Sequence, residues 1–155
     1  MGLTRFVRGC GYTRGVKKVW IVFGVLLGLA LAQSGPVVYQ QNCVFCHGET
    51  GQGRVGAFPP LAGHSPALVA LEQGRVQLIN TLLYGMQGQI RAKGNNYNGV
   101  MPSFGQLSDD QLANVLNHIL TAWNNDRQLP NSFKPISPAE IAAARATRLT
   151  PQQVG

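Results

Sequence analysis

Two cysteines, Cys43 and Cys46, are separated by two residues, and His47 follows the second one directly. This C-x-x-C-H pattern is typical of covalent haem c attachment, in which both thiols add across the haem vinyl groups as thioethers. In a helical turn, the spacing brings both sulfurs beneath one porphyrin edge and directs His47 at the iron. The pattern predicts a small fold built around one covalently attached haem c.

Other uses of a cysteine pair fit this sequence less well. An exported pair could form a disulfide, but the close spacing and the histidine that follows favour haem. A zinc site would need a fourth ligand besides Cys43, Cys46 and His47, and neither His64 nor His118 belongs to a partnering motif. A thioredoxin-type redox pair normally lies in a βαβ setting, and no such strand pattern is present.

Residues 1–32 have the features of a signal peptide. Five basic residues precede an uncharged, mostly apolar run of 14 residues, Val19–Ala32, which ends in an A-x-A cleavage signal. An uncleaved membrane anchor is the alternative, but the run is shorter than the roughly 20 residues that a spanning helix needs. We expect cleavage after Ala32, which removes Cys10 and leaves a mature chain of 123 residues beginning at Gln33.

Cleavage changes the charge of the protein. The whole chain has a net charge of +7, but the mature chain keeps eight basic and six acidic residues, a net charge of +2. The high isoelectric point therefore reflects the export segment, and we expect no binding of nucleic acid.

Two capping boxes predict where helices begin. The first, residues 108–111, precedes a helix with one apolar stripe from Leu112 to Trp123. The second, residues 137–140, precedes a helix that we expect to run to about Leu149. The other expected elements are a helix from Gly35, a helical stretch from Ser65 that is interrupted at Gly74, and a small hairpin over residues 89–98 with its turn at 93–95.

A second axial iron ligand must come from further along the chain, where Met86, Met101, His64 and His118 are the candidates. Met101 precedes Pro102 in a glycine-containing loop, which can hold a thioether against iron, and methionine with histidine suits a cytochrome c by raising its potential. Met86 follows an apolar helix end and is expected to fill core space. We predict that Met101 is the ligand.

Short stretches over nearly the whole mature chain match one known family. These stretches are Ala57–His64, Leu83–Gly85, Gln87–Ile90, Tyr97–Met101, Val115–Ile119, Thr121–Trp123, Phe133–Pro135 and Leu149–Val154. The chain resembles class I cytochromes c, and within them the small monohaem cytochromes c of Thermus-type bacteria, which donate electrons to terminal haem–copper oxidases.

The resemblance implies roles for individual residues. Cys43 and Cys46 would be the thioether sites, His47 the proximal iron ligand and Met101 the distal one. The carbonyl of Pro59 resembles the acceptor that orients the proximal histidine in the family.

The resemblance also implies an all-α class I cytochrome c fold with a minor β-hairpin and a helical C-terminal extension. We expect a haem domain over residues 33–125, with residues 126–155 packed on it. Gly35 and Tyr39 resemble the positions where the first helix crosses the last one, whereas His118 stands where many relatives have tyrosine.

The function implied is a periplasmic one-electron carrier, located in the periplasm or on the outer face of the membrane, and not an enzyme. The expected acceptor is a membrane terminal oxidase of the haem–copper type, and the donor a quinol-oxidising complex or another cytochrome. We expect a monomer. A haem enzyme would need an open coordination site, which Met101 closes, and a gas sensor would need an output domain.

Overall fold

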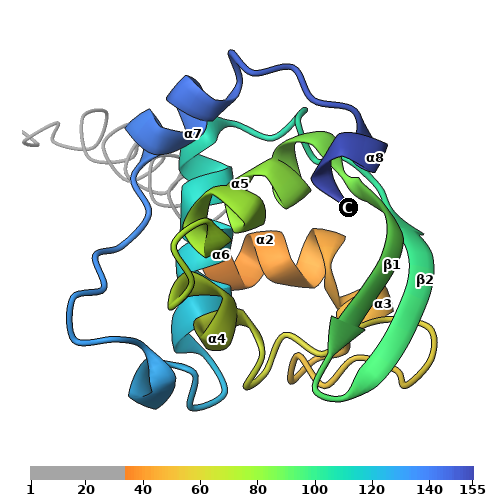
Figure 1. Cartoon of the computed structure of the whole chain (residues 1–155). Helices are drawn as coiled ribbons and strands as arrows, with labels where there is room; N and C mark the ends of the chain where they lie inside the picture. Colours follow the sequence, from red (N-terminus) through yellow and green to blue (C-terminus); the bar gives the residue numbers. More distant parts are fainter. Residues whose placement is uncertain (1–33) are drawn as a thin grey trace, which may run out of the picture. The chain divides into compact units, whose positions relative to one another are not determined.

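The computed structural model describes residues 34–155. The predicted signal peptide, its cleavage after Ala32 and Cys10 lie outside the described residues. The elements, shown in Figure 1, are α2 (Gly35–Asn42), α3 (Val44–His47), α4 (Ser65–Val69), α5 (Gly74–Tyr84), β1 (Met86–Ala92), β2 (Asn95–Met101), α6 (Asp109–Thr121), the 3-10 turn η1 (Asp126–Gln128), α7 (Pro138–Ala144) and α8 (Pro151–Val154). Within this part of the chain, none of the helices has the length and apolar character needed to cross a bilayer.

Helices α2 and α6 cross at Gly35. A side chain at this position would meet the backbone carbonyl of Asn114 and would lie only 2.7 Å from the Cβ of His118. Glycine therefore allows the two helices to approach each other closely. One turn further along α2, the ring of Tyr39 packs against the rings of Trp123, at 5.0 Å, and His118, at 5.5 Å.

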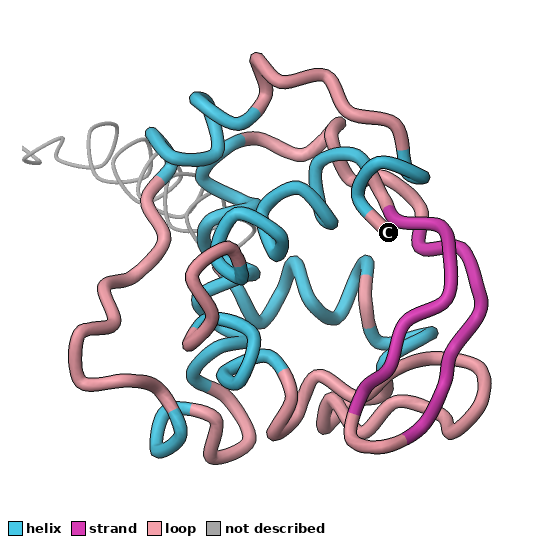
Figure 2. The backbone as a smooth tube through the Cα atoms, in the orientation of Figure 1, coloured by secondary structure: helices cyan, strands magenta, loops and turns pink. Residues whose placement is uncertain are grey.

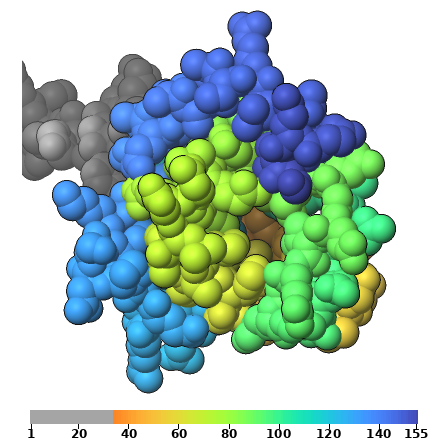
Figure 3. Space-filling view, viewed as in Figure 1, coloured from red at the N-terminus to blue at the C-terminus, as the bar shows by residue number. Residues whose placement is uncertain are grey.

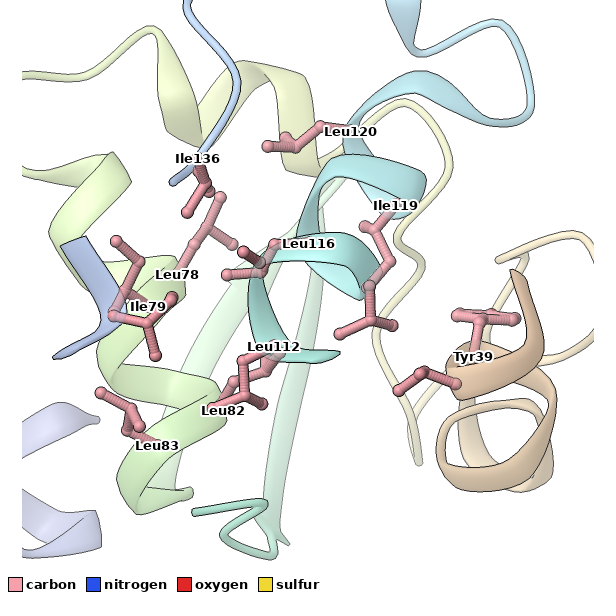
Figure 4. Close-up of a cluster of buried hydrophobic side chains, with 14 residues drawn as sticks. Tyr39, Leu78, Ile79, Leu82, Leu83, Leu112, Leu116, Ile119, Leu120 and Ile136 are labelled. Atoms are coloured by element: carbon pink, nitrogen blue, oxygen red, sulfur yellow. The ribbon is translucent and has the colours of Figure 1, made fainter. Parts of the chain in front are cut away.

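Buried aliphatic side chains from α2, α5, α6 and the C-terminal segment form one core (Figure 4). The apolar stripe predicted for α6 is confirmed from Leu112 to Leu120. It is wrong at Trp123, because α6 ends at Thr121 and Trp123 has a φ of 56°, outside the helical region. Trp123 still packs against the core, where its ring contacts Tyr39.

The hairpin is longer than the sequence predicts. β1 and β2 pair antiparallel from Ala92 and Asn95 beside the turn to Met86 and Met101 at the far end, and Figure 2 shows them together at one side of the helices. Met101 is thus the last residue of a strand and not part of a loop. The connection is the two residues Lys93 and Gly94, both with positive φ, a turn whose twist matches that of paired strands.

The C-terminal segment packs on the rest of the described chain. Ile136, Ile141 and Val154 are all buried. Helix α7 begins at the predicted capping box but ends at Ala144, not near Leu149. Further along, Arg148 has a φ of 50°, and its backbone N–H donates to the hydroxyl of Tyr84.

Candidate functional site

The cysteine pair lies in a single helical turn. Cys43 ends α2 and precedes α3, and its carbonyl accepts hydrogen bonds from the backbone N–H of Cys46, at 3.2 Å, and of His47, at 2.9 Å. Both cysteines are partly buried, and they are not joined to each other by a disulfide. Burial raises the pKa of the Cys43 thiol to about 11, and the neighbouring Cys46 adds to this shift.

The His47 ring is buried and held by one backbone acceptor. Its Nδ1 donates to the carbonyl of Pro59 at 2.9 Å, as the family resemblance implies. Burial lowers the pKa of His47, while the hydrogen bond to Pro59 opposes the shift. A neutral imidazole that donates through Nδ1 keeps its Nε2 lone pair for a metal ion, and the acceptor fixes the orientation of the ring.

Two adjoining pockets meet at this histidine. The outer one has an empty volume of about 750 Å³ and the inner one about 550 Å³, both counted with the open space at their mouths. Cys43, His47 and Met101 line both, whereas Cys46 and Pro59 line the outer pocket. Figure 3 shows the hollow between the hairpin and the segment around α4. The structure thus brings all five predicted site residues to one continuous space.

The hairpin forms one wall of the outer pocket, and few side chains project from the middle of this wall. Gly88 of β1 is paired with Gly99 of β2, and both line the outer pocket. A side chain at Gly99 would meet only the Ala57 carbonyl, at 3.8 Å, so protein packing does not require glycine there. The space fits a flat, largely apolar ring system, and two cysteine side chains beside a histidine are the groups that covalent haem attachment needs.

The competing ligand candidates are placed differently from Met101. Met86 lines only the outer pocket, and neither His64 nor His118 lines either pocket. The ring of His118 packs edge-on against Trp123, 5.6 Å away, and burial lowers its pKa. Among the four candidates, Met101 is the residue that reaches both pockets together with His47.

Sequence reasoning missed the hairpin residues that complete the wall. Ile90 and Tyr97 form a cross-strand pair and line the outer pocket. A signal was present, because alternate residues of a strand share one face. From Met86 every second residue lines the pocket as far as Ile90. The same alternation runs from Tyr97 to Met101, with Val100 lining the pocket in addition. Recognising the full length of the hairpin would have identified them.

Comparison with known proteins agrees with this geometry. Residues 30–119 match the family described as cytochrome c oxidase, cbb3-type, subunit III. The chain is 53% identical to a cytochrome c-552 of Thermus thermophilus over 140 residues, which cover 90% of this chain and 93% of that protein. The chain belongs to the cytochrome c family. As a cytochrome c it contains covalently bound haem c with its iron, and it is an electron carrier and not an enzyme.

Two further relatives extend the comparison. Another cytochrome c-552 of Thermus thermophilus is 54% identical over 120 residues, covering 77% of this chain and 90% of that protein. The cytochrome c subunit of the alcohol dehydrogenase (quinone) of Gluconobacter oxydans is 32% identical over 74% of this chain but over only 22% of its own length. The resemblance to class I and Thermus-type cytochromes c that the sequence indicated is thus confirmed.

Proposed function

We propose that this cytochrome c is an exported one-electron carrier in which His47 and Met101 are the axial iron ligands. The observation that carries the proposal is that these two residues, from α3 and the end of β2, line the same two pockets. Cys43 and Cys46 would hold the group as thioethers. When bound, haem c supplies a one-electron Fe(III)/Fe(II) couple.

The protein residues have separate tasks in this proposal. The Pro59 carbonyl keeps the His47 ring in one orientation through its 2.9 Å hydrogen bond. Gly85 allows the start of β1 to pass close to the end of β2, because a side chain there would lie 2.5 Å from the Met101 carbonyl. With both axial positions filled by protein, a small molecule has no free coordination site, which suits electron transfer and not catalysis at the metal.

The proposed acceptor is a membrane terminal oxidase of the haem–copper type, and the donor a quinol-oxidising complex or another cytochrome. The description of the matching family, which names an oxidase subunit, supports this acceptor. The export segment predicted at residues 1–32 supports action in the periplasm or on the outer membrane face. We propose that the carrier acts as a monomer.

The mouth of the outer pocket is the proposed docking surface. Among the described residues, none that lines this pocket is Asp, Glu, Lys or Arg. Ala57, Phe58 and Val100 line it, and Val100 is 64% exposed. Phe45 and Val55, close in the chain to the site residues, are 89% and 77% exposed. Such a surface favours a short-lived apolar contact with the partner.

The ligand assignment is tested by paired substitutions in the holoprotein. Met101→Ala should remove the weak far-red iron–sulfur charge-transfer band of the oxidised protein and lower its reduction potential. Met86→Leu, at the residue paired with Met101 across the hairpin, should preserve both. Loss of the band in the Met86 variant, with its survival in the Met101 variant, would show that Met86 is the ligand.

A further inference from the structure

The segment that follows Met101 is held by a side chain from the C-terminal part of the chain. Arg145, which directly follows α7, donates from Nη1 to the carbonyl of Gly105 at 2.7 Å and from Nη2 to the carbonyl of Leu107 at 2.6 Å. Its Nε forms an ion pair with Asp109 at 2.6 Å. The planar guanidinium thus fixes three points of this segment in one arrangement.

The preceding residues of the same segment are attached to α5. The hydroxyl of Ser103 donates to the carbonyl of Leu83 at 2.5 Å, and the backbone N–H of Phe104 donates to that of Leu82 at 2.8 Å. Arg145 extends this attachment to the beginning of α6. Residues 102–109 are therefore restrained along their length, immediately after Met101.

The hairpin is restrained from its other strand by the end of the chain. Gly155 lies against the carbonyl of Gln87, the residue after the cross-strand partner of Met101. The side chain of Gln152 donates to that of Gln87 at 2.9 Å. The C-terminal segment consequently contacts both the strand beside Met101 and the segment that follows it.

We propose that Arg145 is a positioning residue for Met101, which keeps the thioether from leaving the sixth coordination position. The inference rests on the proposed ligation of iron by Met101. A thioether is an uncharged ligand that does not attract the iron through a charge of its own. How long the Met101 sulfur stays on the iron therefore depends on how far the segment that carries it can move. Arg145 limits this movement through the carbonyls of Gly105 and Leu107.

Arg75 offers a matched control. Its guanidinium also fastens the C-terminal segment, through the carbonyls of Lys134 and Pro135 and an ion pair with Glu140 at 2.6 Å. Arg75 lies at the beginning of α5, whereas residues 103 and 104 are attached near its end. Nine residues separate Arg75 from Tyr84, the last residue of α5, which is about 14 Å along the helix. Removing Arg75 should loosen the C-terminal segment without releasing residues 102–109.

The experiment compares the ferric holoproteins of Arg145→Met, Arg145→Lys and Arg75→Met with the wild type, well below their melting temperatures. The rate of cyanide binding is measured by stopped-flow absorbance, because cyanide can bind only after the sixth ligand has left. Arg145→Met should increase this rate at least about tenfold, and Arg145→Lys should give an intermediate rate. The cyanide-binding rate of Arg75→Met should stay within about twofold of the wild-type rate, even if its melting temperature falls as far as that of Arg145→Met.

The outcomes separate this inference from the proposed function. An unchanged rate in Arg145→Met, or equal increases in Arg145→Met and Arg75→Met, would overturn the role of Arg145 while leaving the ligand assignment intact. A far-red band that survives Met101→Ala would overturn both. A band that Met101→Ala removes, together with faster cyanide binding in Arg145→Met alone, would support both.

Discussion

Ile141→Ala tests whether the C-terminal segment folds as one unit with the haem domain. Ile141 is completely buried in the core, together with residues of α5 and α6. The substitution removes three carbon atoms, for which the lost transfer free energy is about 2.4 kcal/mol. The cavity left behind raises the expected cost to about 3 to 4 kcal/mol. At about 4 °C per kcal/mol, the melting temperature should fall by about 12 to 16 °C.

Thermal unfolding of the holoprotein should be followed in parallel by far-ultraviolet circular dichroism and by haem absorbance. Both signals should shift together, because a single cooperative unit loses all its structure at once. Leu71→Ala is the control: this leucine is 61% exposed, and its loss should cost less than about 0.5 kcal/mol. If Ile141→Ala costs no more than the control, or shifts one signal only, the segment is not part of the cooperative core.

Two further predictions concern charge. Hydrogen bonds from Arg75 lower the pKa of Glu140 from 4.5 to about 2, so its contribution to stability is complete above about pH 4.5 and disappears as the pH falls toward 2. Because this side chain is 38% exposed and screened by solvent, Glu140→Gln should lose only about 1 kcal/mol at pH 7, and denaturant unfolding should show the difference vanishing in acid. The rate of electron transfer to the proposed acceptor, a terminal oxidase, should depend only modestly on ionic strength. A decrease of about a hundredfold at high salt in stopped flow would reveal strong electrostatic steering.

Local patterns in the sequence were sufficient to predict the centre of the site. The C-x-x-C-H spacing predicts the turn at Cys43–His47, and the capping boxes at Ser108 and Ser137 predict where α6 and α7 begin. Each of these features is determined by residues within a few positions of one another. The hydrogen bond from His47 to Pro59 spans twelve residues. It was predicted from the family resemblance and not from a local pattern.

The features that were missed depend on contacts between distant residues. The path of the chain after α7 includes a left-handed backbone at Arg148 and a hydrogen bond from its N–H to the hydroxyl of Tyr84, 64 positions earlier. The direction of Trp123 follows from its packing on Tyr39. The bonds of Arg145 reach 36 to 40 residues back. No periodicity or motif near any of these residues contains this information, because the partner is brought close only by the fold.

The distribution of charge connects the C-terminal segment with the proposed docking surface. The ion pairs in the described residues, Arg75 with Glu140 and Arg145 with Asp109, both join this segment to the part of the chain that precedes it. The walls of the outer pocket, as residues 34–155 form them, contain no Asp, Glu, Lys or Arg. Apart from Arg54, whose guanidinium lies 5.7 Å from the centre of the Phe58 ring, little charge would have to be desolvated when a partner covers the mouth, and desolvated charge would oppose a close approach. An apolar mouth on a restrained scaffold allows the haem edge to meet a partner without removing water from ions, and it allows the complex to separate quickly after the electron has moved.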